Sequence, residues 1–395
     1  MTMDYQPLAS STSRPLRVMV LRGVDGAGGG ADKIILRNAE KVDTNRIRMA
    51  LVFFRHETDG SYDFDRRAAA AGLEYHEVRH RGALDRRVYP QLKQLAETIK
   101  PDVIHAHEYK ANFFARRLSR QLQIPVMSTA HGWTGDSWRE RWFYYPADKR
   151  QLRHFDQVIA VSSQIRDELV VHGAAPDRVQ VLLNGVDPQQ YRRDDEVRQR
   201  VREQLGFRAE HCVLGAVGRA EQQKRFDLLL KYFAKLVVER RDLRLVIAGD
   251  GSRLAELRDQ MQKLNLSEYV QILGHCPAMR DLYQAFDVFV QTSDYEGTPT
   301  VVVEAMALEL PIVSTDVGGT SELIHDQQHA LLVPPRDERS WCAAVQRCLQ
   351  DAVATAERVA AARRRVEVEL NFDRRLEKLS AIYESVVAKW KLKQD

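Results

Sequence analysis

The feature that most constrains the fold is a repeated alternation of short apolar runs with longer segments of helical periodicity. Runs rich in Val, Ile and Leu recur from Leu16 to Leu183, and a second series extends from Val213 to Val333. This alternation is typical of a parallel sheet with helices on both faces. Because the pattern starts twice, we predict the α/β class, with two Rossmann-like, doubly wound domains.

The segment between the two series has the composition of a hinge. Turn residues stand at Asn184-Gly-Val-Asp-Pro188, and residues 189–204 are polar and charged. We therefore predict a flexible tail at 1–14, an N-terminal domain at 15–188 and a C-terminal domain at 189–374. Apolar residues at helical spacing within 375–392 predict a last helix, which caps the second domain or packs back on the first.

Composition excludes several classes of protein. The chain has 395 residues, enough for two cores, and its net charge of +4 does not indicate nucleic acid as a partner. Its four cysteines form no C-x-x-C pair and no zinc-binding spacing. The start of the sequence has no apolar h-region, so we expect no signal peptide, and no run of roughly 18 apolar residues occurs in it. We expect a cytoplasmic protein, at most associated with the inner face of the cytoplasmic membrane.

Two acids around one turn form the first candidate site. Glu296 and Glu304 stand eight residues apart, across the start of a predicted helix. The first turn of a helix offers unpaired N–H groups and a positive dipole end, which suit a phosphate or diphosphate. Eight helical residues rise about 12 Å, so the acids would flank that anion, and the predicted ligand is a nucleotide-sugar. The residues that follow the first acid are Gly297, Thr298, Pro299 and Thr300.

Basic residues after another predicted strand match this anion. Gly218 and Arg219 close the strand, and Lys224 follows before the next helix. A planar guanidinium and a compact ammonium together suit a diphosphate. Gly249 and Asp250 end the next strand, so we expect them at the same edge of the sheet.

The first domain offers weaker signals. The glycine-rich loop at 23–30 is a near match to the dinucleotide-binding fingerprint. The acid expected about 20 residues further on is missing, which disfavours a nicotinamide oxidoreductase. We expect the loop to bring backbone amides close to a ligand. His131, with His105 and His107, is placed at the carboxyl ends of strands, where open α/β sheets bind ligands.

Two other motifs leave alternatives open. Asp63-Phe-Asp65 has the D-x-D form of a metal site, but it stands just ahead of a predicted helix, which favours a helix cap, and we assign no metal. The segment 138–153 mixes aromatic and basic residues at helical spacing. It is predicted to lie on an anionic membrane surface, to frame an acceptor site, or to be an ordinary surface helix.

The set of motifs resembles the retaining glycosyltransferases of family four (GT4), of the kind that builds bacterial polysaccharides. The resemblance rests on the order and spacing of His131-Gly132, Gly218-Arg219 with Lys224, Gly249-Asp-Gly251, the E-x7-E pair and Gly318-Gly319-Thr320. It covers about residues 16–390 and is strongest over 213–335. It implies the GT-B fold, in which two Rossmann-like domains face each other across a cleft.

The resemblance also implies roles for individual residues. Arg219 and Lys224 would neutralise the donor diphosphate, Glu304 would hold the ribose hydroxyls, and Glu296 would hold hydroxyls of the donor sugar. Backbone groups of 297–301 would complete the phosphate site, and His131 would lie near the transferred sugar. Neither a metal nor a cofactor is implied. Residues expected at an acceptor or phosphate loop are Asp25, Gly28, Gly29, Gly30 and Asp136.

The function that follows is a retaining transfer of a sugar from a UDP-sugar or GDP-sugar to a lipid-linked saccharide. The pathway would be synthesis of an exopolysaccharide, a capsule or a lipopolysaccharide. Two alternatives stay open: a nucleotide-sugar epimerase of the same architecture, and a sugar-nucleotide-binding protein without catalytic activity.

Overall fold

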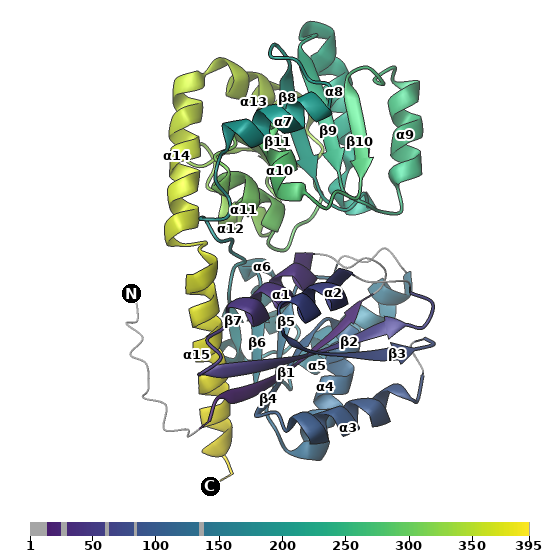
Figure 1. Cartoon of the computed structure of the whole chain (residues 1–395), viewed down its shortest axis with the longest axis vertical. Helices are drawn as coiled ribbons and strands as arrows, with labels where there is room; N and C mark the ends of the chain where they lie inside the picture. Colours follow the sequence, from purple (N-terminus) through teal and green to yellow (C-terminus); the bar gives the residue numbers. More distant parts are fainter. Residues whose placement is uncertain (1–13, 25–29, 60–62, 83–84, 134–137, 395) are drawn as a thin grey trace. The chain divides into compact units, whose positions relative to one another are not determined.

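The computed structural model describes residues 14–24, 30–59, 63–82, 85–133 and 138–394. It divides into two compact units (Figure 1). The first contains the described residues up to Leu182 together with those from Asp373 onward, and the second comprises Leu183–Phe372. No helix within the described residues is long and apolar enough to cross a bilayer.

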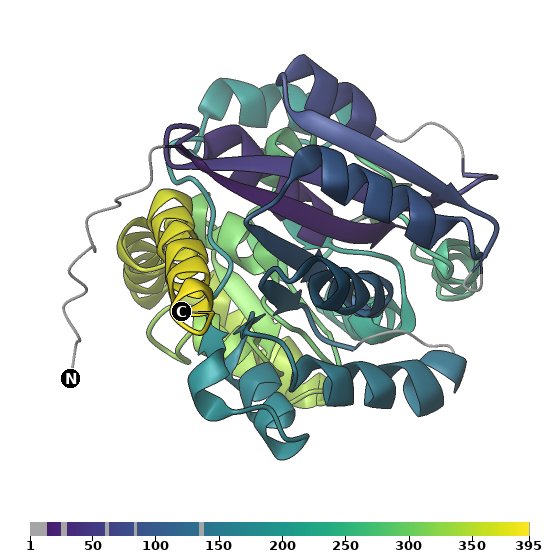
Figure 2. The same ribbon diagram turned by 90° about the horizontal axis from the view of Figure 1, so that it is seen from below.

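The first unit is a seven-stranded sheet in the order β3-β2-β1-β4-β5-β6-β7, with helices on both faces (Figure 2). Its strands are β1 (Leu16–Val24), β2 (Ile47–His56), β3 (Glu74–His80), β4 (Val103–His107), β5 (Val126–Ala130), β6 (Gln157–Ala160) and β7 (Val179–Val181). Its helices and helical turns are α1 (Gly30–Lys41), α2 (Asp63–Ala70), α3 (Val88–Ile99), α4 (Tyr109–Leu122), η1 (Glu140–Tyr144), α5 (Tyr145–Leu152), α6 (Ser163–Val171) and η2 (Pro176–Arg178).

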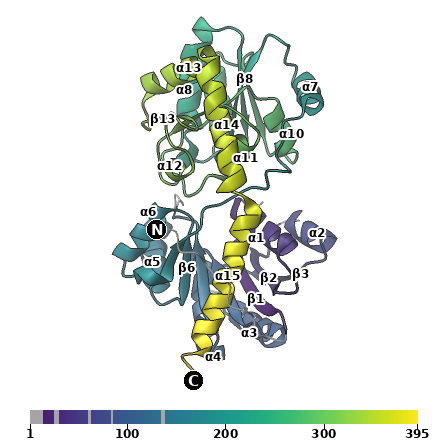
Figure 3. The ribbon, with the colours of Figure 1, turned by 90° about the vertical axis from the view of Figure 1, so that its left-hand side faces the viewer.

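The last helix, α15 (Phe372–Lys391), runs along the first unit (Figures 1 and 3). Its apolar stripe is buried there, with Leu379 and Tyr383 each 1% exposed. Arg46 beside β2 pairs with Glu377 and Glu384 of this helix at 2.8 and 3.0 Å. The helix therefore belongs physically to the first unit, although it follows the second in sequence.

The second unit is a six-stranded sheet in the order β10-β9-β8-β11-β12-β13. Its strands are β8 (Cys212–Val217), β9 (Leu243–Ala248), β10 (Val270–Gly274), β11 (Val288–Val290), β12 (Ile312–Thr315) and β13 (Leu331–Val333). Its helices and helical turns are α7 (Asp195–Gln204), η3 (Gln222–Lys224), α8 (Phe226–Glu239), α9 (Leu254–Lys263), α10 (Met279–Gln284), α11 (Thr300–Ala307), α12 (Thr320–Leu323), α13 (Glu338–Gln350) and α14 (Ala352–Val368).

Every pairing between these strands is parallel. Central strands such as β4 and β5 are buried along their whole length, because helices cover both faces of each sheet. The predicted α/β class with two doubly wound sheets is confirmed. In both sheets the order of strands reverses beside the first strand, between β1 and β4 and between β8 and β11. Ligands of such sheets bind at the carboxyl ends of the strands at that point.

The segment 138–153 differs from the single helix that its periodicity suggests. It forms the π-helical turn η1 and then α5, which begins at Tyr145 with Pro146 in its first turn. Proline has no N–H and clashes with the carbonyl four residues earlier, so a regular α-helix cannot run through it. The chain therefore forms a wider, π-helical turn ahead of the proline.

Candidate active site

Three loops at the carboxyl edge of the second sheet pack directly against one another. The Gly249 amide donates to the Gly274 carbonyl at 2.8 Å, and the Ala220 amide donates to the Asp250 carbonyl at 2.9 Å. Gly249 has a φ of +132°, and a Cβ there would lie 1.9 Å from the Gly218 carbonyl oxygen. Only glycine fits this position, which holds the loops after β8 and β9 in contact.

At the switch point, Lys224 and Glu296 form a largely buried ion pair. Lys224 Nζ lies 2.5 Å from Glu296 Oε1, and their side chains are 13% and 6% exposed. A Cβ on Gly218 would be 2.9 Å from Lys224 Cε, so the missing side chain makes room for the lysine. The structure thus brings together the predicted cation after β8 and the predicted acid after β11.

Glu296 is held through one of its two oxygens. Besides Lys224, Gln291 Nε2 donates to Oε1 at 2.7 Å and Ser293 Oγ donates to it at 2.5 Å. Ser314 Oγ donates to the amide oxygen of Gln291 at 2.7 Å, which fixes the direction of that amide. Among the described residues no hydrogen bond reaches Oε2 of Glu296. That oxygen remains an acceptor for hydroxyl groups of a ligand.

Glu304 lies on α11, which begins at Thr300, so only the second half of the spacing between the two acids is helical. The estimate of eight helical residues between them was therefore wrong, because residues 296–299 form a loop. Tyr191 Oη donates to Glu304 Oε1 at 3.2 Å. Burial, reinforced by the nearby charge of Glu304, raises the pKa of Tyr283 well above its ordinary value. The hydroxyl groups of Tyr191 and Tyr283 therefore both lie close to the carboxylate of Glu304.

The other predicted residues of this unit lie on the same edge. Arg219 and Asp250 are exposed, and no side-chain ion pair of Arg219 is found within the described part of the chain. Gly297 is half-buried, whereas Thr298 and Pro299 are buried ahead of α11. The Gly319 amide donates to the Glu296 carbonyl at 2.9 Å, which ties the Gly318-Gly319-Thr320 loop to the acid.

In the first unit, three histidines line up at the ends of β4 and β5. His107 Nδ1 lies 3.0 Å from His131 Nε2, and the rings stack with centroids 5.3 Å apart. His105 contacts Tyr383 Oη at 2.7 Å and Thr129 Oγ1 at 2.8 Å. Burial first, and then the cations Arg22 and Arg375, lowers the pKa of His131 well below its ordinary value.

The contact between His107 and His131 links the protonation of their ring nitrogens. Burial lowers the pKa of His107 well below its usual value too, so both rings are neutral near pH 7. Two facing ring nitrogens form a hydrogen bond when one proton lies between them. Whichever ring holds that proton decides whether Nδ1 of His131 is a donor or an acceptor. His107 therefore sets what His131 offers to a ligand.

The residues predicted at an acceptor or phosphate loop, and the D-x-D motif, belong to the first unit. Asp25, Gly28, Gly29 and Asp136 lie outside the described residues, and Gly30 is an exposed residue at the start of α1. Asp63 and Asp65 are in the first turn of α2. No group of three or more His, Cys, Asp or Glu side chains suited to a metal ion occurs in the described part of the chain.

The residues that position the two acids were not predicted from the sequence. Gln291, Ser293 and Ser314 bind Glu296 directly or through one hydrogen bond, and Tyr191 binds Glu304. The available signal was the polar run Gln-Thr-Ser directly after the buried strand β11. Buried polar side chains need hydrogen-bond partners. A run of them at the carboxyl end of a strand therefore indicates a ligand site there.

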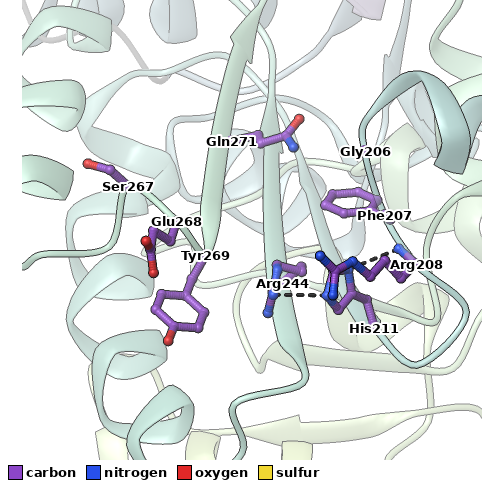
Figure 4. A pocket seen from close by; sticks show the side chains of 9 residues that line it. All are labelled: Gly206, Phe207, Arg208, His211, Arg244, Ser267, Glu268, Tyr269 and Gln271. Atoms are coloured by element: carbon purple, nitrogen blue, oxygen red, sulfur yellow. Dashed lines mark hydrogen bonds between the residues drawn. The ribbon is translucent and has the colours of Figure 1, made fainter.

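A hollow of about 270 Å³ lies at the opposite edge of the second unit's sheet (Figure 4). Arg244 stands near the start of β9, where its guanidinium contacts His211 Nε2 at 2.9 Å, and Gln271 stands near the start of β10. These are the amino ends of the strands, away from Lys224 and Glu296. The hollow is therefore not part of the candidate active site.

Solved structures place the fold in the GT-B class of glycosyltransferases. The crystal structure of Anabaena HepE in complex with UDP and glucose superposes with a TM-score of 0.81 at 20% identity, covering 93% of this chain and 99% of that one. WaaG, a glycosyltransferase involved in lipopolysaccharide biosynthesis, superposes with a TM-score of 0.72 at 17% identity, covering 92% and 99%.

The chain itself belongs to glycosyltransferase family 4. The model of Glycosyltransferase Family 4 matches residues 28–190, and that of Glycosyl transferases group 1 matches residues 197–366. D-inositol 3-phosphate glycosyltransferase 1 of Catenulispora acidiphila is 27% identical over 307 residues, which cover 72% of each chain. The protein is thus a retaining, metal-independent hexosyltransferase that uses a nucleotide-sugar, and the resemblance seen in the motifs is confirmed.

Proposed function

We propose that the protein transfers a hexose from a UDP-sugar or GDP-sugar to a lipid-linked saccharide during synthesis of a bacterial surface or secreted polysaccharide. The names of similar structures support the pathway, since WaaG is involved in lipopolysaccharide biosynthesis and WaaB is a lipopolysaccharide outer core galactosyltransferase. The complexes of HepE with UDP and UDP-glucose make a UDP-sugar the first donor to test. The matching family models are those of transferases, so neither alternative is carried forward.

The assignment of roles rests on Glu296, whose Oε1 is held by three donors: the ammonium of Lys224, the amide of Gln291 and the hydroxyl of Ser293. Oε2 would accept hydrogen bonds from hydroxyls of the donor sugar. Lys224 would turn from the carboxylate to the diphosphate when the donor enters, with Arg219 as the second cation. Glu304 would hold the ribose, and the first amides of α11 would hold a phosphate.

These groups suit the charge that develops during the reaction. The bond from the anomeric carbon to the diphosphate oxygen breaks, a bond from the acceptor oxygen to that carbon forms on the same face, and the acceptor proton passes to the leaving phosphate. Negative charge grows on the diphosphate, where cations and helix amides stabilise it. His131 would contact the transferred sugar through Nδ1, as a neutral ring.

A lipid-linked acceptor implies contact with a membrane, which we assign to the segment 138–153. Trp138, Trp142 and Phe143 in it are 62%, 71% and 61% exposed. Large aromatic side chains beside arginines are typical of segments that lie in the headgroup region of a bilayer.

The test combines donor binding with product identification. A ligand that binds only the folded state raises its stability, so thermal midpoints with UDP, GDP and ADP should identify the base. The matching sugar nucleotide is then incubated with a lipid-linked saccharide. An α-configured glycoside from an α-configured donor is the expected product. A free epimer, or no product with any donor and acceptor, would refute the proposal.

A further inference from the structure

The hollow at the amino ends of β9 and β10 has a different kind of side chain on each of its two sides (Figure 4). Arg208, His211 and Arg244 lie on one side, and Ser267 and Glu268 lie on the other. Its volume of about 270 Å³ is below the roughly 300 Å³ at which sites for drug-sized ligands begin. It therefore suits a small molecule with two unlike ends, and no role described so far uses it.

The cationic side contains Arg244, whose charge the protein does not neutralise. Its Nη1 donates to the backbone carbonyls of Arg241 and Leu243 at 2.9 and 2.8 Å. No ion pair of Arg244 with an acid occurs among the described residues. Asp242, two residues earlier, is paired with Arg240 at 2.6 Å. A half-buried guanidinium without an acid favours an anion from outside the chain.

His211 lies between two hydrogen-bond donors that a neutral imidazole cannot both satisfy. The backbone N–H of Arg208 donates to its Nδ1 at 3.1 Å, and Arg244 Nη2 contacts its Nε2 at 2.9 Å. Burial and the charge of Arg244 lower the pKa of His211. The ring therefore holds one proton near pH 7, and only one of its nitrogens accepts a hydrogen bond. In either tautomer one of the two donors lacks an acceptor, which an anion beside Arg244 and His211 would supply.

The other side of the hollow carries groups that bind hydroxyls. Ser267 and Glu268 are exposed, and neither side chain has a hydrogen bond to another group in the described part of the chain. Gln271 Nε2 donates to the Leu205 carbonyl at 2.8 Å, which fixes the amide and leaves its oxygen as an acceptor. A hydroxyl, a carboxylate and an amide oxygen all accept hydrogen bonds from hydroxyl groups. This side therefore suits a monosaccharide.

We propose that the hollow binds a phosphorylated monosaccharide, with its phosphate monoester on the Arg244 side and its hydroxyls on the Ser267 side. A phosphate monoester carries close to two negative charges near pH 7 and has three terminal oxygens. Arg244 and His211 would bind two of these oxygens, and the exposed guanidinium of Arg208 would bind the third. The inference goes beyond sugar transfer, because the hollow lies at the edge of the sheet opposite to the candidate active site.

The test titrates glucose 6-phosphate, glucose 1-phosphate, inorganic phosphate and glucose into the full chain in an isothermal calorimeter. At least one of the two sugar phosphates should bind. Its affinity should exceed that of inorganic phosphate and of glucose about tenfold or more, because only the sugar phosphate contacts both sides of the hollow.

Substitutions on each side of the hollow locate the binding. Arg208→Gln and Arg244→Gln each remove a charged hydrogen bond and should weaken binding of the sugar phosphate by roughly 10- to 100-fold. Ser267→Ala should weaken it about fivefold and leave inorganic phosphate unaffected, because it removes a contact to a sugar hydroxyl. Arg339→Gln, which removes an exposed arginine of α13 in the same unit, is the matched control. Circular dichroism and the thermal midpoint check folding, and the exposed Arg208 keeps the test informative if Arg244→Gln is unstable.

Losses confined to the variants of Arg208, Arg244 and Ser267 would support the proposal. It would be overturned if the wild-type protein bound neither sugar phosphate, or if inorganic phosphate bound as tightly as they do. An equal loss in Arg339→Gln would reduce the effect to net charge and overturn it too. Loss of binding in Lys224→Met but not in Arg244→Gln would place the sugar phosphate at the candidate active site, which contradicts a separate site in the hollow.

Discussion

At Glu296, three donors converge on one carboxylate oxygen and the second oxygen has no protein partner among the described residues. Glu296→Gln should keep the shape of the side chain but weaken the bonds to sugar hydroxyls and the pairing with Lys224. We expect kcat/KM to fall by about 10² to 10³, as when one stabilising group of an active site is removed.

The control for this variant is Glu210→Gln, an exposed acid 3.8 Å from Arg208. It should leave kcat/KM unchanged. Initial rates over a range of donor concentrations give both values. Full activity in Glu296→Gln would show that this carboxylate does not contact the reacting sugar.

His107 offers a second test at the scale of one residue. Its Nδ1 faces His131 Nε2 at 3.0 Å, so it should select the tautomer of His131. In His107→Phe the ¹⁵N spectrum of His131 should change from one tautomer toward a mixture, and kcat should fall about tenfold. A lower stability with an unchanged His131 spectrum would mean that His107 serves packing only.

At the scale of elements, the contact between the loops after β8 and β9 depends on Gly249. A Cβ there would lie 1.9 Å from a backbone oxygen, which cannot move as a flexible side chain can. Gly249→Ala should therefore destabilise the protein by more than about 2 kcal/mol and weaken donor binding. Chemical denaturation and a thermal shift with donor measure the two effects.

Gly206→Ala is the matched control for the glycine. Gly206 also has a positive φ, +71°, but nothing lies within 4 Å of its added Cβ. Its cost should be limited to backbone strain, about 1 to 2 kcal/mol, with no change in donor binding. Equal effects of the two substitutions would contradict the role given to the loop contact.

The contact between α15 and β4 predicts a pH dependence of stability. Burial lowers the pKa of His105 from 6.5 to about 3, so between these values the unfolded chain binds a proton that the folded chain does not. Stability contributed by neutral His105 is complete above pH 6.5 and is lost as pH falls toward 3. Near pH 5 this residue should add about 1.4 kcal/mol per pH unit to the slope of the unfolding free energy.

Urea denaturation of wild type and His105→Asn between pH 4.5 and 8 measures that slope. The variant loses contacts to Tyr383 and Thr129 and is expected to be less stable at every pH. The informative quantity is the slope below pH 6, which should be smaller in the variant. If the unfolding free energies of the two proteins changed in parallel with pH, His105 would bind a proton in the folded protein as it does in the unfolded chain.

At the scale of the whole molecule, the fold was predictable because parallel strands buried on both faces are continuous apolar runs. The second series of apolar runs, predicted from Val213 to Val333, corresponds to the strands from β8 at Cys212–Val217 to β13 at Leu331–Val333. Helices α13 and α14 were not predicted. In α14, arginines interrupt the apolar stripe, and Arg358 itself is buried.

The site was predictable in its residue types but not in its contacts. Charged residues and glycines at strand ends indicated Lys224 and Glu296 separately. Their ion pair depends on how β8 and β11 align, and those strands are far apart in sequence. Gln291 and Ser314 act through Glu296, so no local pattern in the sequence marks them. Their role is visible only from the hydrogen bonds.

Under the proposed function, Lys224 beside Glu296 binds the diphosphate of the donor. Isothermal titration of the preferred nucleoside diphosphate, and of its nucleoside without phosphates, into wild type and Lys224→Met measures this directly. We expect Lys224→Met to bind the diphosphate about 100-fold more weakly and the nucleoside with unchanged affinity. Equal affinity of both proteins for the diphosphate would contradict it.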